Sequence, residues 1–204
     1  MKLSIVMPAV VHRIDPTPPI YAEINRQIGD NPDVEFLALV DNGRMSIGRK
    51  MDLLYGMARG AFTCGVADDD MVKDDYVSTL VGAITEHPDV DVVSFNHNYY
   101  VDGEYKAVIK ESITLKPSNS WEQELFTRTP SSKCAVRTDY CRPFTHPDLW
   151  HGEDVAFARW VLPKLENEHY IDRVLYDYLY RGDNKNFRRH MECIGSTRRL
   201  GSHG

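Results

Sequence analysis

A run of acidic residues follows an apolar stretch of the chain. Residues 62–67 are predicted to form a buried strand, and three carboxylates come directly after it: Asp68, Asp69 and Asp70. Adjacent carboxylates repel one another, and a divalent cation removes that repulsion because hard carboxylate oxygens suit magnesium or manganese. An acidic turn that faces water explains the same run, since salt screens exposed charges. The run alone leaves both interpretations open.

A second group of charged residues lies where another helix is expected to begin. Ser46 can cap a helix over residues 47–58, and Arg49 and Lys50 follow close behind it. Cations are unfavourable there because the helix N-terminus is partly positive, so a bound anion would gain from both the dipole and the side chains. The preceding strand ends at Asp41, whose carboxylate can accept hydrogen bonds from a nucleobase or a ribose. A solvated helix surface is the alternative explanation.

Two further acids, Glu153 and Asp154, follow Gly152 at the start of a later predicted helix. The helix dipole favours acids in a first turn, so capping alone explains them. The functional alternative is a general base, because a carboxylate at this position can take a proton from a hydroxyl group. Taken by themselves, these residues favour capping.

The first half of the chain alternates apolar strands with helices. Strands are expected over 3–7, 34–40, 62–67 and 90–95, and helices over 20–28, 47–58 and 76–85. This order predicts an α/β fold with a parallel sheet covered on both faces, in which ligands bind at the carboxyl ends of the strands. We expect Pro8 to end the first strand, and Gly60 to close the second helix at its C′ position.

The second half has a different pattern. The expected elements are a hairpin over 96–110 that turns at Asp102-Gly103, a short helix over 120–128, a loop-rich stretch up to Gly152, a helix over 153–162 and a late strand over 174–181. Repeats and linkers are missing from the sequence. One continuous domain with a mixed sheet over residues 1–200 is the simplest interpretation, and residues 201–204 resemble a tag remnant.

Composition excludes several classes of protein. The 204 residues are 42% hydrophobic and 26% charged, which is typical of a globular chain able to bury a core without disulfides. No run of about 18 apolar residues occurs, and the start lacks a signal-peptide pattern, so we expect a cytoplasmic protein without a membrane span. The four cysteines lack metal-site spacing and are expected to be free thiols. A net charge of −6 argues against a general nucleic-acid coat.

Taken together, these segments resemble the family 2-like GT-A glycosyltransferases over roughly residues 2–181. The matching motifs are Leu3-Ser4-Ile5-Val6-Met7-Pro8, Val40-Asp41-Asn42-Gly43, Arg49-Lys50, the stretch from Gly60 to Asp70, Gly152-Glu153-Asp154 and Tyr178-Leu179-Tyr180-Arg181. Their order and separation carry the resemblance. Many members have a second acid where this chain has Asn42, and Asp69 makes the register of the D-x-D motif ambiguous by one residue.

The resemblance implies a GT-A-type nucleotide-diphospho-sugar transferase fold, with a central, mostly parallel mixed sheet and helices on both faces. It also implies a metal-dependent, inverting transfer of a hexosyl or pentosyl group from a nucleotide-diphosphate sugar to a hydroxyl acceptor, with a UDP-sugar as the default donor. Residues 1–97 would then form the nucleotide-sugar-binding half, and residues 98–200 the acceptor-binding half.

Roles for individual residues follow from the same resemblance. The implied donor-binding residues are Pro8, Asp41, Arg49, Lys50, Asp68 and Asp69, and the implied ligands of Mn²⁺ or Mg²⁺ are Asp70 and Asp68. Asp154 takes the place of the catalytic base, with Glu153 beside it, which reverses the preference for capping. His190 is a further candidate metal ligand, although a surface histidine beside Arg188 and Arg189 explains it better.

The acceptor is not indicated by any motif, and neither is the oligomeric state. A saccharide is favoured over a hydroxymethylated DNA base of the kind that compact phage enzymes modify, whose phosphates the basic stretch 185–199 would meet. A sugar nucleotidyltransferase ranks second among the functions, because a Gly-rich basic loop normally follows its first strand, where this chain has Ala9-Val10-Val11-His12-Arg13. A non-catalytic nucleotide-sugar-binding module ranks third.

Overall fold

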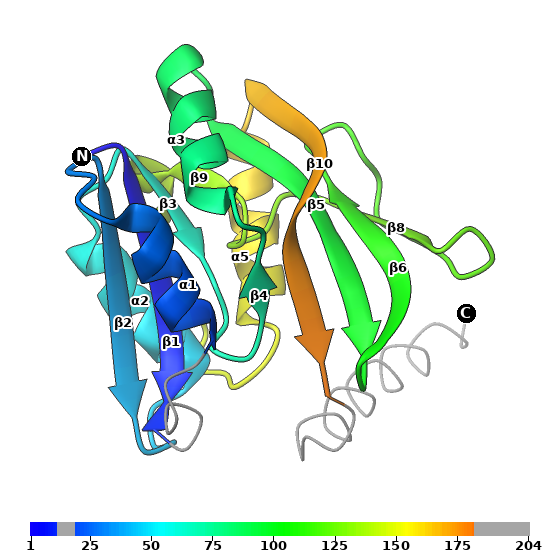
Figure 1. Cartoon of the computed structure of the whole chain (residues 1–204), viewed down its shortest axis with the longest axis horizontal. Coiled ribbons are helices and arrows are strands. Elements are labelled where there is room, and N and C mark those ends of the chain that lie inside the picture. The colour runs from blue at the N-terminus through cyan, green and yellow to red at the C-terminus, as the bar shows by residue number, and fades with distance from the viewer. Residues whose placement is uncertain (12–18, 182–204) are drawn as a thin grey trace, which may run out of the picture.

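The chain folds around one mixed sheet, which a computed structural model describes over residues 1–11 and 19–181 (Figure 1). Its strands are β1 (Leu3–Val10), β2 (Val34–Asp41), β3 (Phe62–Gly65), β4 (Met71–Val72), β5 (Val92–Val101), β6 (Glu104–Glu111), β7 (Ser118–Ser120), β8 (Leu125–Arg128), β9 (Ala135–Arg137) and β10 (Glu168–Tyr180). The helices are α1 (Pro19–Ile28), α2 (Ile47–Met57), α3 (Tyr76–Glu86), α4 (Thr138–Cys141) and α5 (Glu153–Val161), which the 3-10 turn η2 (Leu162–Lys164) continues.

The centre of the sheet is mostly parallel. The strand order is β2-β1-β3-β9-β5-β6-β8-β7, and β10 pairs with both β5 and β4. β1 runs parallel to β2 and to β3, and β5 runs parallel to β10. The short strand β9 is antiparallel to both β3 and β5, so these two strands share one direction. The predicted α/β class with a mixed, mostly parallel sheet is confirmed.

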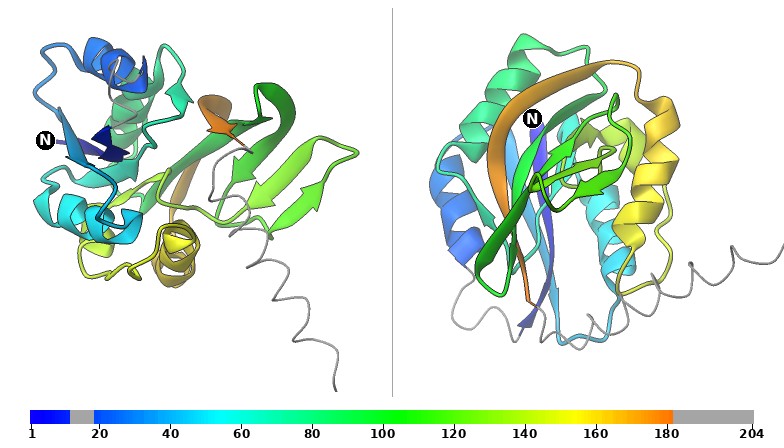
Figure 2. Two further views of the ribbon diagram at one scale, coloured as in Figure 1. Left: turned by 90° about the horizontal axis from the view of Figure 1, so that it is seen from below. Right: turned by 90° about the vertical axis from the view of Figure 1, so that its right-hand side faces the viewer.

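Helices cover both faces of the sheet, as the right-hand view of Figure 2 shows, with α1 and α3 on one side and α2 and α5 on the other. Ile24 and Leu80 pack in the first hydrophobic cluster, and Leu54 and Phe157 pack in the second. Every second residue of β1 from Leu3 to Ala9 belongs to the first cluster, and Val6 belongs to the second, because side chains of a strand point to opposite faces in turn. The buried strands therefore form the middle of three layers.

Gly60 allows the connection from α2 to β3 to pass close to β1. A Cβ atom added there would lie 2.5 Å from the backbone nitrogen of Ser4 and 2.6 Å from the carbonyl carbon of Leu3. The Gly60 N–H also donates a hydrogen bond of 2.8 Å to the Ser4 hydroxyl. The helix itself ends at Met57, with Ala58 as its C-cap. The prediction that Gly60 occupies the C′ position is therefore wrong, and the close approach of β1 explains the glycine instead.

β1 continues through Pro8, so the prediction that this proline ends the strand is also wrong. Pro8 pairs with Leu39 of β2, and the strand ends at Val10. On the other side, the pairing with β3 ends where Val6 lies opposite Gly65. The missing N–H of proline is tolerated because Pro8 lies beyond the part of β1 that two strands flank.

The second half contains strands where a helix and a loop were expected. The predicted helix over 120–128 is wrong, because β7 and β8 form an antiparallel pair there and β8 adds to β6. That pairing buries Phe126, which outweighs the local preference for a helix. β9 lies inside the stretch expected to be a loop. The β5–β6 hairpin is confirmed, with Asp102 and Gly103 both at positive φ, and the predicted boundary at residue 97 falls within β5.

Two expectations from composition can be compared with the described residues. None of the helices in that part of the chain has the length and apolar character needed to cross a membrane. Cys64, Cys134 and Cys141 are buried free thiols, and Cys193 lies outside the described residues.

Replacing Gly60 by alanine tests the close approach to β1. Gly60→Ala is expected to lower the free energy of unfolding by about 1–3 kcal/mol, because the new methyl group overlaps backbone atoms of Leu3 and Ser4. Urea denaturation followed by circular dichroism measures the change.

Gly82 in α3 provides the matched control, since a Cβ added there meets nothing within 4 Å. Gly82→Ala is expected to raise the free energy of unfolding by up to about 1 kcal/mol, through higher helix propensity. A Gly60→Ala variant as stable as the wild type contradicts the close approach.

Candidate active site

A cavity of about 250 Å³ lies at the carboxyl ends of β1, β3 and β10. Asp68 and Asp69 line it from the turn after β3, and Glu153 and Asp154 line it from the start of α5. Lys133, from the turn before β9, also lines the cavity. Ligands bind open α/β sheets at this end of the strands, so the cavity is the candidate active site.

Only part of the predicted site lines this cavity. The predicted residues found there are Pro8, Asp68, Asp69, Glu153 and Asp154, and those found elsewhere are Asp41, Arg49, Lys50 and Asp70. Arg49 is exposed on α2. His190 and the basic stretch 185–199 lie outside the described residues.

Asp41 and Lys50 neutralise each other. The Lys50 Nζ lies 2.5 Å from Asp41 Oδ1 and donates a hydrogen bond of 2.6 Å to the carbonyl of Ala9. Asp41 Oδ2 accepts the backbone N–H groups of Arg44 and Met45, each at 2.7 Å. The Lys50 ammonium and these N–H groups hold the pKa of Asp41 well below its usual range. Asp41, which was expected to contact a nucleoside, is thus paired with Lys50, which was expected to contact an anion.

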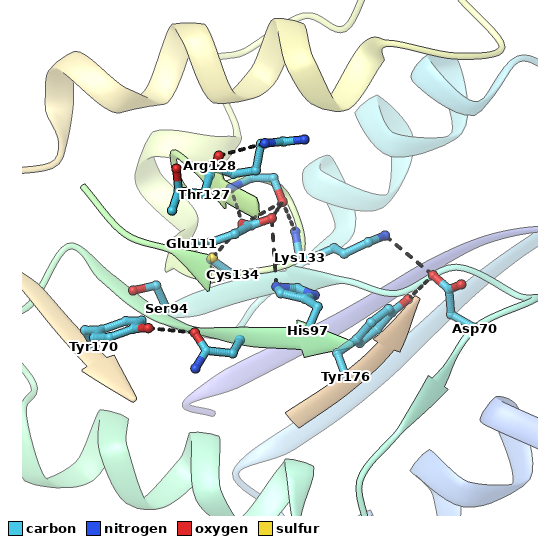
Figure 3. Close-up of polar contacts among 12 residues, drawn as sticks. Asp70, Ser94, His97, Glu111, Thr127, Arg128, Lys133, Cys134, Tyr170 and Tyr176 are labelled. Carbon is cyan, nitrogen blue, oxygen red and sulfur yellow. Dashed lines mark hydrogen bonds and ion pairs between the residues drawn. The ribbon is translucent and has the colours of Figure 1, made fainter. Parts of the chain in front are cut away.

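The carboxylate of Asp70 is fully buried and already has partners. Tyr176 donates its hydroxyl to Oδ2 at 2.6 Å, and the backbone N–H of Leu179 donates to Oδ1 at 2.8 Å. The Nζ of Lys133 lies 3.6 Å from Oδ2, and a dashed line marks this ion pair in Figure 3. Burial raises the pKa of Asp70, and the Lys133 charge acts against that rise. Both oxygens of the predicted metal ligand are therefore engaged within the protein.

The acidic run does not form a ready metal site. Asp68 Oδ2 accepts the backbone N–H of Val10 at 3.0 Å, and Asp70 is held as described above. Within residues 1–11 and 19–181, no group of three or more His, Cys, Asp and Glu side chains is arranged to hold a metal ion. The site for Mn²⁺ or Mg²⁺ stays a prediction, and the donor set seen here does not fit it.

Glu153 and Asp154 form an acidic pair at the edge of the cavity. Gly152 precedes them with φ +84°, a left-handed conformation that favours glycine. Burial and the charge of Asp154 raise the pKa of Glu153 to about 7, and its buried Oε2 finds no hydrogen-bond partner within the described part of the chain. Asp154 is exposed, and its Oδ1 accepts the N–H of Val155 at 2.8 Å. Such a pair can hold or release one proton near neutral pH.

Lys133 is a site residue that no sequence motif included. Its Nζ lies 5.1 Å from the ring centres of both Tyr176 and Tyr178, within cation–π range. Burial alone lowers the pKa of Lys133, but the neighbouring carboxylates, Asp70 first, raise it above its usual value, so the side chain is charged. A single lysine in a loop carries no sequence signal, and only its three-dimensional position reveals it.

Two histidines outside the predicted set also line the cavity, His146 and His151. The Nδ1 of His146 lies 2.7 Å from Asp52 Oδ1, which also accepts the backbone N–H of His146 at 2.8 Å. Burial lowers the pKa of His146. The Nε2 of His151 is buried and has no hydrogen-bond partner among the described residues. It is thus a polar atom on the cavity wall that a ligand can satisfy.

No protein-family model and no curated protein matches the chain. Similar solved structures include S. aureus TarS 1–349, which has 16% identity and a TM-score of 0.56 over 88% of this chain and 60% of that one. TarS 1–349 in complex with UDP-GlcNAc has 14% identity and a TM-score of 0.54 over 95% and 65%, and the complex with UDP has 16% identity and a TM-score of 0.57 over 89% and 61%. The fold is that of the GT-A glycosyltransferases. The chain spans less than two thirds of each of these TarS chains.

Replacing Glu153 by glutamine tests the raised pKa. The folded-state value of about 7 exceeds the ordinary 4.5, so the folded protein binds this proton more tightly and loses stability as the pH rises through this interval. The loss amounts to about 1–3 kcal/mol. Glu153→Gln should therefore raise the melting temperature by several degrees at pH 8 and leave it unchanged at pH 4. Thermal unfolding at both pH values measures the difference.

The exposed Glu122 supplies the control. Glu122→Gln is expected to produce no gain that depends on pH. A Glu153→Gln variant with the same change in melting temperature at pH 4 and pH 8 contradicts the raised pKa.

Proposed function

We propose that the cavity binds a nucleotide-diphosphate sugar and transfers its sugar to a hydroxyl acceptor. The observation that carries the proposal is the meeting of the Asp68–Asp69 turn and the Glu153–Asp154 pair in one cavity at the carboxyl ends of the strands. TarS structures of the same fold with UDP-GlcNAc and with UDP support this donor class. We favour a UDP-sugar, with Pro8, Asp68 and Asp69 on the donor side.

The exposed carboxylate of Asp154, with Glu153 beside it, takes the proton of the acceptor hydroxyl. The acceptor oxygen forms a bond to the anomeric carbon while the bond from that carbon to the diphosphate oxygen breaks. The nucleoside diphosphate leaves with the electron pair of the broken bond. A single displacement of this kind inverts the configuration at the anomeric carbon.

We favour a saccharide as the acceptor over a hydroxymethylated DNA base. Both carry the hydroxyl group that the transfer requires. Mn²⁺ or Mg²⁺ remains the cofactor that the D-x-D resemblance proposes, and such an ion would neutralise charge on the leaving diphosphate. Both oxygens of Asp70 already accept hydrogen bonds within the protein, so no step of the proposed transfer depends on a metal ion.

Release of nucleoside diphosphate from a panel of UDP- and GDP-sugars tests the function. The wild type is expected to hydrolyse at least one donor slowly without acceptor. Asp154→Asn should slow that release by about 10²- to 10⁴-fold, because it removes the exposed carboxylate that takes the proton, while calorimetry shows donor binding unchanged.

Asp139→Asn is the control, because Asp139 is an exposed acid of α4 outside the cavity lining, and it should keep the wild-type rate. Activity of Asp154→Asn equal to the wild type contradicts the role of this residue. The transfer function is wrong if no UDP- or GDP-sugar binds or turns over, with or without manganese.

A further inference from the structure

A diphosphate that enters this cavity meets an excess of negative charge. Among the described residues, Asp68, Asp69, Glu153 and Asp154 line the cavity, and the lining side chains of that part of the chain that are cationic are Lys133 and Arg181. Like charges brought together in a partly buried site repel strongly, since little water screens them. A donor with a diphosphate group therefore needs a cation that the protein supplies or recruits.

Lys133 has the position of such a cation. Its side chain is 23% exposed, lines the cavity and lies within cation–π range of the Tyr176 and Tyr178 rings of β10. Figure 3 shows it pointing toward Asp70. The Nζ stands 3.6 Å from Asp70 Oδ2, which is longer than a hydrogen bond, and that oxygen already accepts the Tyr176 hydroxyl. Asp70 thus attracts the Lys133 ammonium group electrostatically but accepts no hydrogen bond from it. The three N–H donors of this ammonium group can therefore bind a ligand.

The buried carboxylate of Glu111 holds the turn that carries Lys133 through hydrogen bonds. Its oxygens accept the backbone N–H and the hydroxyl of Ser131, each at 2.9 Å, and the Cys134 thiol at 3.1 Å. The Ser131 hydroxyl in turn accepts the backbone N–H of Lys133 at 3.3 Å. Glu111 is 6% exposed, so these bonds are shielded from water. The turn is therefore held on both sides of Lys133, so its side chain leaves a fixed backbone position.

The predicted metal ligand is committed to the same arrangement. The two carboxylate oxygens of Asp70 accept hydrogen bonds from Tyr176 and Leu179. The positive charge near this carboxylate is the ammonium group of Lys133, in the place where a metal ligand would have its metal ion. The donor set therefore favours a built-in cation over a recruited one.

We propose that Lys133 binds the diphosphate of the donor, so that its ammonium group contacts the phosphate oxygens and stabilises the charge on the leaving nucleoside diphosphate. This inference rests on the proposed function. It assigns to a side chain of this protein the charge neutralisation that the D-x-D resemblance assigns to a divalent metal.

Calorimetric titration in EDTA with UDP and with uridine tests the proposal, since the two ligands differ only in the diphosphate. The wild type is expected to bind UDP under these conditions. Lys133→Met keeps the length and the apolar stem on the tyrosine rings but removes the charge, so it should weaken UDP binding by about 10- to 100-fold and leave uridine binding unchanged. Lys133→Arg keeps the charge and should retain most of the UDP affinity.

Lys73 provides a matched control, because its Nζ also pairs with an aspartate, Asp177, at 2.7 Å but does not line the cavity. Lys73→Met should bind both ligands like the wild type. Unchanged uridine binding by Lys133→Met also demonstrates that this variant folds.

The proposal is overturned if Lys133→Met binds UDP as tightly as the wild type, or if it loses UDP and uridine affinity equally. It is also overturned if the wild type binds UDP only after manganese is added. These results leave the proposed function standing, because UDP still binds. Failure of the wild type to bind UDP, uridine and every UDP- or GDP-sugar, with and without manganese, overturns the proposed function together with this inference.

Discussion

The buried carboxylate of Asp70 is the constraint on which the candidate site depends. A charge taken out of water is costly unless hydrogen bonds and an opposite charge surround it. Tyr176 and Leu179 of β10 supply the hydrogen bonds, and Lys133 supplies the opposite charge. The Tyr176 hydroxyl also accepts the N–H of Ala67, so the chain leaving β3 is tied to β10. Three segments distant in sequence are thus brought together around one carboxylate, and the cavity forms where they meet.

The cavity lining combines two chemically different groups of side chains. Lys133 and the Asp68–Asp69 turn form the group that we assign to the donor, where the charge of a diphosphate must be balanced. Glu153 and Asp154 lie at the start of α5, where one carboxyl is partly buried with a raised pKa and the other is exposed. A cation for a leaving group and a carboxylate for a hydroxyl proton are the two functions that a displacement at a sugar carbon requires.

Local patterns in the sequence predicted the elements that depend on local chemistry. The Ser46 cap of α2 and the turn at Asp102-Gly103 are confirmed because each rests on neighbouring residues. The three residues of β9 are too few for a periodic signal, and β8 is a strand because β6 pairs with it. Local patterns also do not reveal which charged side chains pair with each other in the folded chain. Asp41, for example, is neutralised by Lys50 from the next helix. Lys133 belongs to no motif, and only the packing of β10 against its turn makes it a site residue.

A crystal structure of the full chain with UDP is the most direct measurement of the central claim, which is that this cavity holds a nucleotide diphosphate against a cation of the protein. The account predicts density for the diphosphate in the cavity, with phosphate oxygens at hydrogen-bond distance from the Lys133 ammonium and Asp70 still bound to Tyr176. Density for UDP at another surface contradicts the account. A diphosphate held through a metal ion on Asp68 and Asp70, with Lys133 turned away from it, contradicts it as well.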